Sequence, residues 1–224
     1  MLDIRNMDCM ELMAQFENKH FDIAICDPPY GIGEDGEKNH SRSNAARAKQ
    51  YTPKDWDNEP PSDEYFKEVL RVSKFVVMWG ANHYIERMPK QNATCWLIWD
   101  KENGDNDFAD CEMAWTNFDS AVRKFKFRWA GMLQGNMKDK EQRIHPTQKP
   151  VQLYKWILKR FAKDGMKILD THLGSGSIAI AIDSINKIEK LGLTLTASEI
   201  DPEYFTDAMK RIENETAQTS LFSV

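Results

Sequence analysis

The sequence predicts an α/β fold built on a doubly wound, mostly parallel sheet. Two short apolar runs, Phe21–Cys26 and 75–79, are continuous, as is typical of parallel strands buried on both faces. Segments that fit amphipathic helices alternate with such runs along the chain. Residues 166–197 read as a βαβ unit with a glycine-rich first turn. We therefore expect strand ends to line one edge of the sheet, where ligands bind in open α/β folds.

The elements follow from periodicity and from turn residues. Asp8 can cap an early helix, and Gly165 suits the end of a later one. We expect strands at 1–5, 21–26, 75–79, 94–99, 123–129, 166–169 and 193–197, and helices at 10–16, 63–73, 83–88, 151–162, 178–190 and 202–214.

Composition narrows the class of protein. The chain has 224 residues, enough for one domain with a sizeable core, and a formal net charge of −5. That charge does not mark a nucleic-acid binder, although locally clustered basic residues can form such a surface. The four cysteines are scattered, and His145 and His172 lack a third ligand at metal spacing, so we expect no metal and no disulfide. With no signal peptide and no membrane-spanning run, we expect a cytoplasmic protein.

Directly after the run 21–26 stand Asp27, Pro28, Pro29 and Tyr30. Each proline fixes its own φ, biases the preceding residue toward extended geometry and has no N–H. Asp27 and the Pro28 carbonyl thus form a rigid pair of acceptors that fits an exocyclic amino group. Tyr30 offers a flat face for a base, worth roughly 1–3 kcal/mol. A strand followed by a plain proline turn explains the same residues, and the motif alone leaves both open.

Two stretches are candidates for contact with a polyanion. Residues 31–61 form a long irregular segment, and its part 38–54 is basic without an acid, which fits a mobile lid. Residues 123–129 alternate basic and aromatic side chains at strand period. A solvated loop and a solvated edge strand are the alternatives. The candidate nucleic-acid contacts are Arg42, Arg47, Lys49, Arg123, Lys124, Lys126 and Arg128.

The glycine-rich turn begins at Asp170 and contains Gly174 and Gly176. Its glycines allow close approach of the backbone to a ligand, and Glu199 at the end of the second strand can accept hydrogen bonds from ribose hydroxyls. No Gly-Lys-Ser/Thr sequence follows, which excludes a P-loop. The pattern predicts a site for a nucleoside-containing cofactor.

Three motifs together resemble the beta class of amino DNA methyltransferases, which use S-adenosylmethionine. Residues 27–30 match the catalytic tetrapeptide of that family, and 145–150 match the loop that precedes its cofactor motif. Residues 170–177 resemble the cofactor motif and depart from it at Thr171, His172 and Ser177. The catalytic motif comes first, as in the circularly permuted beta arrangement. The resemblance implies a Rossmann-like, circularly permuted class I methyltransferase fold.

The resemblance also implies roles for parts of the chain. Residues 1–99 would form the catalytic half with a mobile loop at 31–61, 100–143 a target-recognition insertion, 144–214 the cofactor-binding half and 215–224 a C-terminal tail. Asp27, Pro28, Pro29 and Tyr30 would be catalytic. The residues expected to bind the cofactor are Asp8, Cys9, Asp27, Thr147, Lys149, Asp170, Leu173, Gly174, Ser175, Gly176, Ser177, Glu199 and Ile200.

The implied activity is methylation of adenine N6 in a flipped-out base of double-stranded DNA, within or outside a restriction-modification pair. A leading Asp in the tetrapeptide favours adenine. The alternatives are a cytosine N4 methyltransferase and a non-catalytic, cofactor-binding DNA module. The order of the motifs counts against RNA or a protein amide as substrate. The recognition sequence, and whether the chain is a monomer or a homodimer, stay open.

The end of the chain resembles a partner-binding peptide. Gln218, Leu221 and Phe222 match the spacing of the short segment by which bacterial proteins bind the replication sliding clamp. An exposed Leu-Phe pair can anchor in an apolar pocket of a partner. The alternative is that both side chains pack on their own domain.

Overall fold

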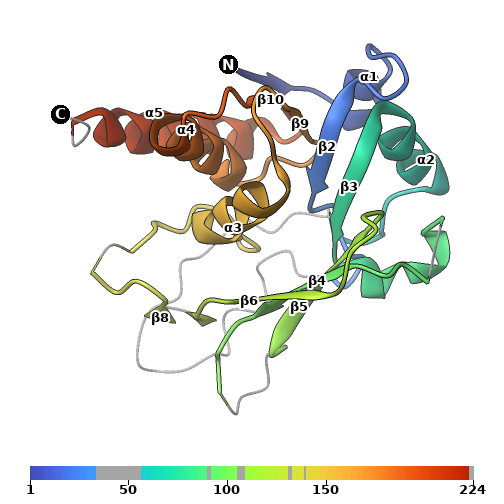
Figure 1. Ribbon diagram of the computed structural model, residues 1–224, viewed down its shortest axis with the longest axis horizontal. Helices are drawn as coiled ribbons and strands as arrows, with labels where there is room; N and C mark the ends of the chain where they lie inside the picture. Colours follow the sequence, from blue (N-terminus) through green and yellow to red (C-terminus); the bar gives the residue numbers. More distant parts are fainter. Residues whose placement is uncertain (34–56, 90–91, 105–108, 131–132, 139, 222–224) are drawn as a thin grey trace.

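The computed structural model describes residues 1–33, 57–89, 92–104, 109–130, 133–138 and 140–221. Within them, one eight-stranded sheet has the order β1-β10-β9-β2-β3-β5-β4-β6, and β7 pairs with β8 (Figure 1). The strands are β1 (Leu2–Asn6), β2 (Phe21–Cys26), β3 (Ser73–Trp79), β4 (Trp96–Asp100), β5 (Cys111–Thr116), β6 (Arg123–Lys126), β7 (Trp129–Ala130), β8 (Leu133–Gln134), β9 (Lys167–Asp170) and β10 (Thr194–Glu199). The α-helices are α1 (Cys9–Met13), α2 (Asp63–Val72), α3 (Val151–Phe161), α4 (Ser177–Glu189) and α5 (Pro202–Leu221).

The sheet is mixed but mostly parallel. From β1 to β3, neighbouring strands all run parallel, and β5 is antiparallel to both of its neighbours, β3 and β4. The edge strand β6 runs parallel to β4. These pairings confirm the predicted α/β class and the mostly parallel sheet.

The order of the sheet reverses between β9 and β2. The chain leaves β9 through α4 toward β10 on one side and leaves β2 through α2 toward β3 on the other. The two central strands pair in parallel, with Ile23 opposite Ile168 and Ala24 opposite Leu169. The turns that follow them therefore open at one switch point, where ligands bind in such sheets. Two motifs far apart in the sequence meet there.

Helices cover both faces of the sheet, as a doubly wound fold requires (Figure 1). On one face α3, α4 and α5 pack against Ile23 and Ile25 of β2. On the other, α1 and α2 pack against Ala24 and Cys26 of the same strand. Since successive side chains of a strand point to opposite faces, burial of both faces explains why β2 is apolar without alternation.

Several elements differ from the expected ones. The strand expected at 123–129 ends at Lys126, because its partner β4 ends opposite it at Asp100. The helix expected at 83–88 is replaced by two 3-10 helices, Ala81–His83 and Ile85–Arg87, separated by the non-helical backbone of Tyr84. The acidic stretch contains the unexpected strand β5.

The C-terminal region is helical farther than expected. The helix predicted to end at residue 214 continues to Leu221, so Gln218 and Leu221 of the suggested clamp peptide lie in α5 and Phe222 lies outside the described residues. Binding of a clamp stays a prediction. Among the described residues, no helix is long and apolar enough to cross a membrane.

The turn after β3 depends on Gly80. Its φ is +73°, and a Cβ built on it would lie 2.0 Å from Cε1 of Tyr30. Gly165 has nearly the same φ, +74°, and a Cβ there would meet no atom within 4 Å. The two positions share the cost of a left-handed backbone and differ in the space beside it.

We predict that Gly80→Ala lowers the free energy of unfolding by about 1–3 kcal/mol more than Gly165→Ala does, because only the first forces the Tyr30 ring to move. Chemical denaturation of both variants measures the difference. Equal losses would show that the ring yields without cost.

Candidate active site

The turn after β2 brings the side chains of Asp27 and Tyr30 together. The Tyr30 hydroxyl donates a hydrogen bond to Asp27 Oδ1 at 2.7 Å. The Tyr30 ring stacks on His83, with centroids 5.2 Å apart and planes at 16°. His83 thus covers one face of the ring that was expected to stack on a base. Sequence reasoning did not identify this contact.

Asp57 fastens this turn from the far end of the long loop. Its Oδ1 accepts hydrogen bonds from the backbone N–H of Tyr30 at 2.6 Å and of Gly31 at 2.9 Å. Its carbonyl accepts the N–H of Gly33 at 3.0 Å, and the residue is buried. Sequence reasoning missed Asp57, since one acid in an irregular segment carries no pattern. Arg42, Arg47 and Lys49 lie outside the described residues.

Lys149 is the buried cation of the site. Its side chain is 3 % exposed, and Nζ donates hydrogen bonds to Asp27 Oδ1 at 2.6 Å and to the Tyr30 hydroxyl at 3.0 Å. Glu112 Oε2 forms an ion pair with the same Nζ at 3.0 Å. Two carboxylates around one ammonium raise the pKa of Lys149 despite its burial. Lys149 contacts the catalytic turn, and its expected place near the cofactor stays a prediction.

The carboxyl groups of Asp27 and Glu112 differ in environment. Burial raises the pKa of Asp27, with Lys149 acting in the opposite direction. Although Glu112 is also desolvated, Lys149 and Lys101 together lower its pKa to about 2. The Lys101 ammonium lies 2.6 Å from Glu112 Oε1. Glu112 and Lys101 lie in the insertion between the motifs, and sequence reasoning assigned them no role.

The glycine-rich turn lies beside Glu199. Glu199 Oε2 accepts the Gly174 N–H at 2.9 Å, and Oε1 accepts the Asp201 N–H at 3.0 Å. Burial raises the pKa of the Glu199 carboxyl. A Cβ on Gly174 would meet nothing closer than 3.9 Å, so this backbone is open to a ligand, whereas a Cβ on Gly176 would lie 2.8 Å from Ile212. Gly176 is therefore needed for the packing of α5.

Asp170 ends β9 in the interior, below this turn. Its Oδ1 accepts the His172 N–H at 3.0 Å, and burial raises its pKa to about 8. Burial also lowers the pKa of His172 to about 4, so the imidazole is neutral at pH 7. The Asp170 carboxyl therefore keeps its proton to a higher pH than an exposed carboxyl does.

The remaining residues expected at the cofactor are distributed around this turn. Asp8 caps α1, as predicted, through hydrogen bonds from Met10 N and Glu11 N to its Oδ1 at 2.7 and 3.2 Å. Ile200 is 64 % exposed, Cys9 is partly buried, and Leu173, Ser175 and Ser177 are buried. Thr147 contacts Nδ1 of His145 through its Oγ1 at 3.2 Å.

Arg211, to which the sequence analysis gave no role, joins the cofactor turn to the rest of the site. The buried Arg211 of α5 donates to the Ser175 carbonyl and to Ser177 Oγ, both at 2.9 Å, and to Glu141 Oε2 at 2.8 Å. Ser177 Oγ in turn donates to the Lys149 carbonyl at 2.8 Å. These bonds fix the turn relative to the loop that carries Lys149. No motif pointed to Arg211, since its partner Glu141 is 70 positions away.

The basic residues of 123–128 do not all lie at the edge of the sheet where Asp27 lies. Lys124 and Lys126 are exposed and lie 3.4 and 4.0 Å from Asp100 Oδ2, and Arg128 is exposed beyond them. Because β6 runs parallel to β4, and β5 is antiparallel to both β4 and β3, Arg123 starts at the edge opposite Asp27. The predicted alternation of cationic and aromatic side chains is present, but Arg123 is far from the catalytic edge.

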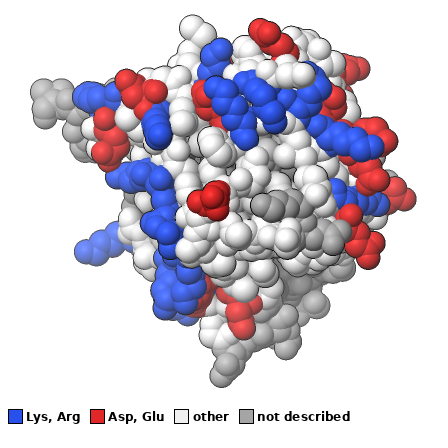
Figure 2. All heavy atoms as spheres, turned by 45° about the vertical axis from the view of Figure 1, so that its right-hand side comes forward, with Lys and Arg blue, Asp and Glu red and all other residues white. Residues whose placement is uncertain are grey.

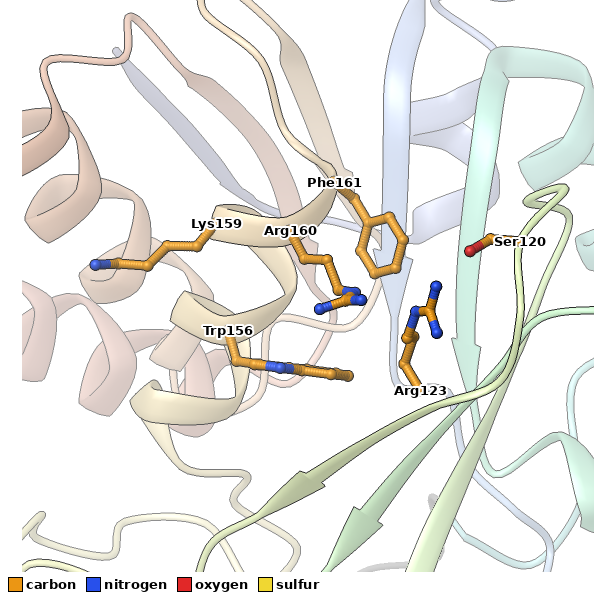
Figure 3. Close-up of a pocket in the computed structure, with 6 residues that line it drawn as sticks. All are labelled: Ser120, Arg123, Trp156, Lys159, Arg160 and Phe161. Carbon is orange, nitrogen blue, oxygen red and sulfur yellow. The ribbon is translucent and has the colours of Figure 1, made fainter.

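Arg123 lines a cavity of about 570 Å³ between β6 and α3. Its guanidinium points toward that of Arg160, above the Trp156 ring, whereas Lys159 points away (Figure 3).

On the face drawn in Figure 2, Lys and Arg gather in two groups separated by uncharged surface, with acidic side chains beside each. In the described part of the chain, no group of three or more His, Cys, Asp or Glu side chains could hold a metal ion.

The chain is similar to known DNA methyltransferases in sequence and in fold. The chain is 23% identical to the type II methyltransferase M2.DpnII of Streptococcus pneumoniae over 93% of this chain and 88% of that one. Its fold is similar to that of M1.HpyAVI solved in complex with SAM, with a TM-score of 0.60 and 18% identity over 95% and 99% of the two chains. It is also similar to the cytosine-N4-specific PvuII DNA methyltransferase, with a TM-score of 0.59 and 11% identity over 97% and 92%.

Half of the chain matches the model of one protein family. The N6_N4_Mtase model, described as DNA methylase, matches residues 99–210, half of the chain. This range contains Glu112, Lys149, the glycine-rich turn and Glu199, and it excludes the tetrapeptide at Asp27. The chain therefore belongs to the N6/N4 family of DNA methylases.

Proposed function

We propose that the chain is a site-specific DNA methyltransferase that methylates the N6 amino group of adenine. The observation that carries this proposal is the position of Asp27 and the Pro28 carbonyl, which follow β2 at the switch point, next to the glycine-rich turn after β9. In the described residues, both hydrogen bonds to the Asp27 side chain fall on Oδ1. Oδ2 is left to accept an N–H of the target amino group.

The cofactor of the proposed reaction is S-adenosylmethionine, and the residues of the glycine-rich turn after β9 fit it. Glu199 would accept hydrogen bonds from the hydroxyl groups of such a molecule, Asp170 would shape the floor of the pocket, and Gly174 leaves room for close approach. When bound, S-adenosylmethionine supplies an electrophilic methyl group on its sulfonium. Asp8 can accept from an adenine amino group only through the oxygen that does not cap α1.

The chain's own residues then position and deprotonate the target. Asp27 and the Pro28 carbonyl accept the two amino hydrogens, which aims the nitrogen lone pair at the crevice, and Tyr30 stacks on the base. Asp27 would accept the proton that the amino nitrogen releases when the new N–C bond forms and the bond from the methyl group to the sulfonium breaks, which leaves a neutral thioether. A cysteine intermediate is not needed: burial raises the pKa of both Cys9 and Cys26 to about 12, which keeps the thiols protonated.

The rest of the proposal concerns DNA. Residues 100–143, which contain the strands β5 to β8, are proposed to recognise the target sequence, with Lys124, Lys126 and Arg128 contacting phosphates. Cytosine N4 is the alternative target, since the same pair of acceptors fits its amino group and a similar fold belongs to a cytosine-N4-specific enzyme.

The test is methyl transfer from labelled S-adenosylmethionine to mixed-sequence duplex DNA, with the product nucleosides identified by mass spectrometry. We expect N6-methyladenine, and we expect Asp27→Ala to abolish transfer while calorimetry shows cofactor binding largely retained. N4-methylcytosine would correct the base alone. Turnover of Asp27→Ala equal to that of the natural chain would remove the catalytic assignment.

Asp170 gives a prediction about stability. A buried carboxyl whose pKa is raised to about 8 keeps its proton in the folded state at a pH where the unfolded chain has lost it. Its contribution to stability is therefore fully present below pH 4 and is lost as the pH rises toward 8. Asn cannot ionise and retains an oxygen for the His172 N–H.

We predict that the difference in Tm between Asp170→Asn and the natural chain, both without cofactor, moves in favour of the variant between pH 4 and pH 8.5. Thermal unfolding across this range measures it, and the differential removes contributions from other groups. A Tm difference that stays constant with pH would mean that Asp170 is ionised throughout.

A further inference from the structure

Four charged side chains form a line from the catalytic turn into the insertion. Asp27 Oδ1 lies 2.6 Å from Lys149 Nζ, Lys149 Nζ lies 3.0 Å from Glu112 Oε2, and Glu112 Oε1 lies 2.6 Å from Lys101 Nζ. The charges alternate and sum to zero. Glu112 is contributed by β5 and Lys101 follows β4, so this line connects the insertion to the tetrapeptide.

Three members of this line have little contact with solvent. Lys149 is 3 % exposed, and Glu112 and Lys101 are 22 % and 18 % exposed. The rings of Tyr30 and Trp79 lie with their centroids 5.4 and 5.6 Å from Lys149 Nζ and keep water from it. An ammonium that is nearly shielded from water pairs strongly with any carboxylate within reach. How the pairing of Lys149 is shared between Asp27 and Glu112 therefore has a large effect on the charge that each carboxylate presents.

The way in which Lys149 is shared between the two carboxylates matters for the reaction. If Lys149 paired with Asp27 alone, the ammonium would neutralise the acceptor that the target amino group needs. Glu112 offers the ammonium a second carboxylate, and Lys101 keeps Glu112 ionised. We infer that Glu112 and Lys101 are positioning residues, which hold the Lys149 ammonium in shared pairing so that it does not weaken Asp27 as an acceptor for the amino group.

The inference rests on the catalytic role proposed for Asp27, but the direction in which each substitution changes the pKa of Asp27 can be tested without turnover. Removing the charge of Glu112 leaves Lys149 to Asp27 and should lower the pKa of Asp27. Removing the charge of Lys101 leaves Glu112 unbalanced and should raise it. The other ionisable groups that interact with Asp27 are Tyr30, Tyr84 on the turn after β3, Tyr154 on α3 and Asp170 on β9, and they are the same in every variant.

The experiment is a pH titration of the Asp27 carboxyl carbon by NMR in the cofactor-free chain, assigned with Asp27→Asn. We expect the midpoint to move down in Glu112→Gln and up in Lys101→Met, each by about 1 pH unit. The double variant Glu112→Gln/Lys101→Met removes one charge of each sign. It therefore serves as a control if a single variant fails to fold because its remaining charge is unbalanced. Glu102→Gln removes an exposed carboxylate of the same insertion, 3.7 Å from Lys126, and should leave the midpoint unchanged.

Kinetics separate the two proposals. In the active chain, the acid limb of kcat should follow the NMR midpoints, with kcat lowered at least tenfold in Glu112→Gln and cofactor affinity unchanged. Midpoints that move in opposite directions in a chain without methyl transfer would support the charge network and overturn only the proposed function. Midpoints that stay in place in both single variants, or that move in the same direction, would overturn the inference.

Discussion

The parallel pairing of β2 with β9 is the constraint on which the rest of this molecule depends. It joins residues 21–26 to residues 167–170, although these stretches are more than half a chain apart. Each strand ends in a rigid turn, one fixed by two prolines and one by glycines in left-handed geometry. Because the strands are parallel neighbours, the acceptor pair and the cofactor turn lie at the same edge of the sheet.

Polar groups hold the two turns in place, and most of them come from segments between the motifs. Asp57 binds the backbone of the catalytic turn, Arg211 binds that of the cofactor turn, and Glu112 binds the ammonium of Lys149. Each of these groups is buried or partly buried, where an unpaired charge is costly and a paired one is directional. The site is therefore built from the motifs and supported by residues that no motif includes.

The sequence predicted the architecture well because its signals are local. Continuous apolar runs identified the central strands, and Asp8 identified the start of α1 from its capping chemistry alone. What depends on tertiary partners could not be predicted. The strand β6 ends where β4 ends, β5 lies in a stretch that its acidic residues marked as a loop, and the Lys149 ammonium pairs with Asp27 and Glu112. Side-chain direction in a loop has no periodicity from which to read it.

The central claim is that the methyl group passes directly from cofactor to base in the crevice between β9 and β2, with no residue of the chain carrying it. The most direct measurement is the stereochemistry of transfer from S-adenosylmethionine whose methyl group is made chiral with hydrogen isotopes. A single displacement inverts the methyl carbon, so the account predicts inversion in the methylated base. Retention would require two displacements and a methylated side chain, and it would contradict the account.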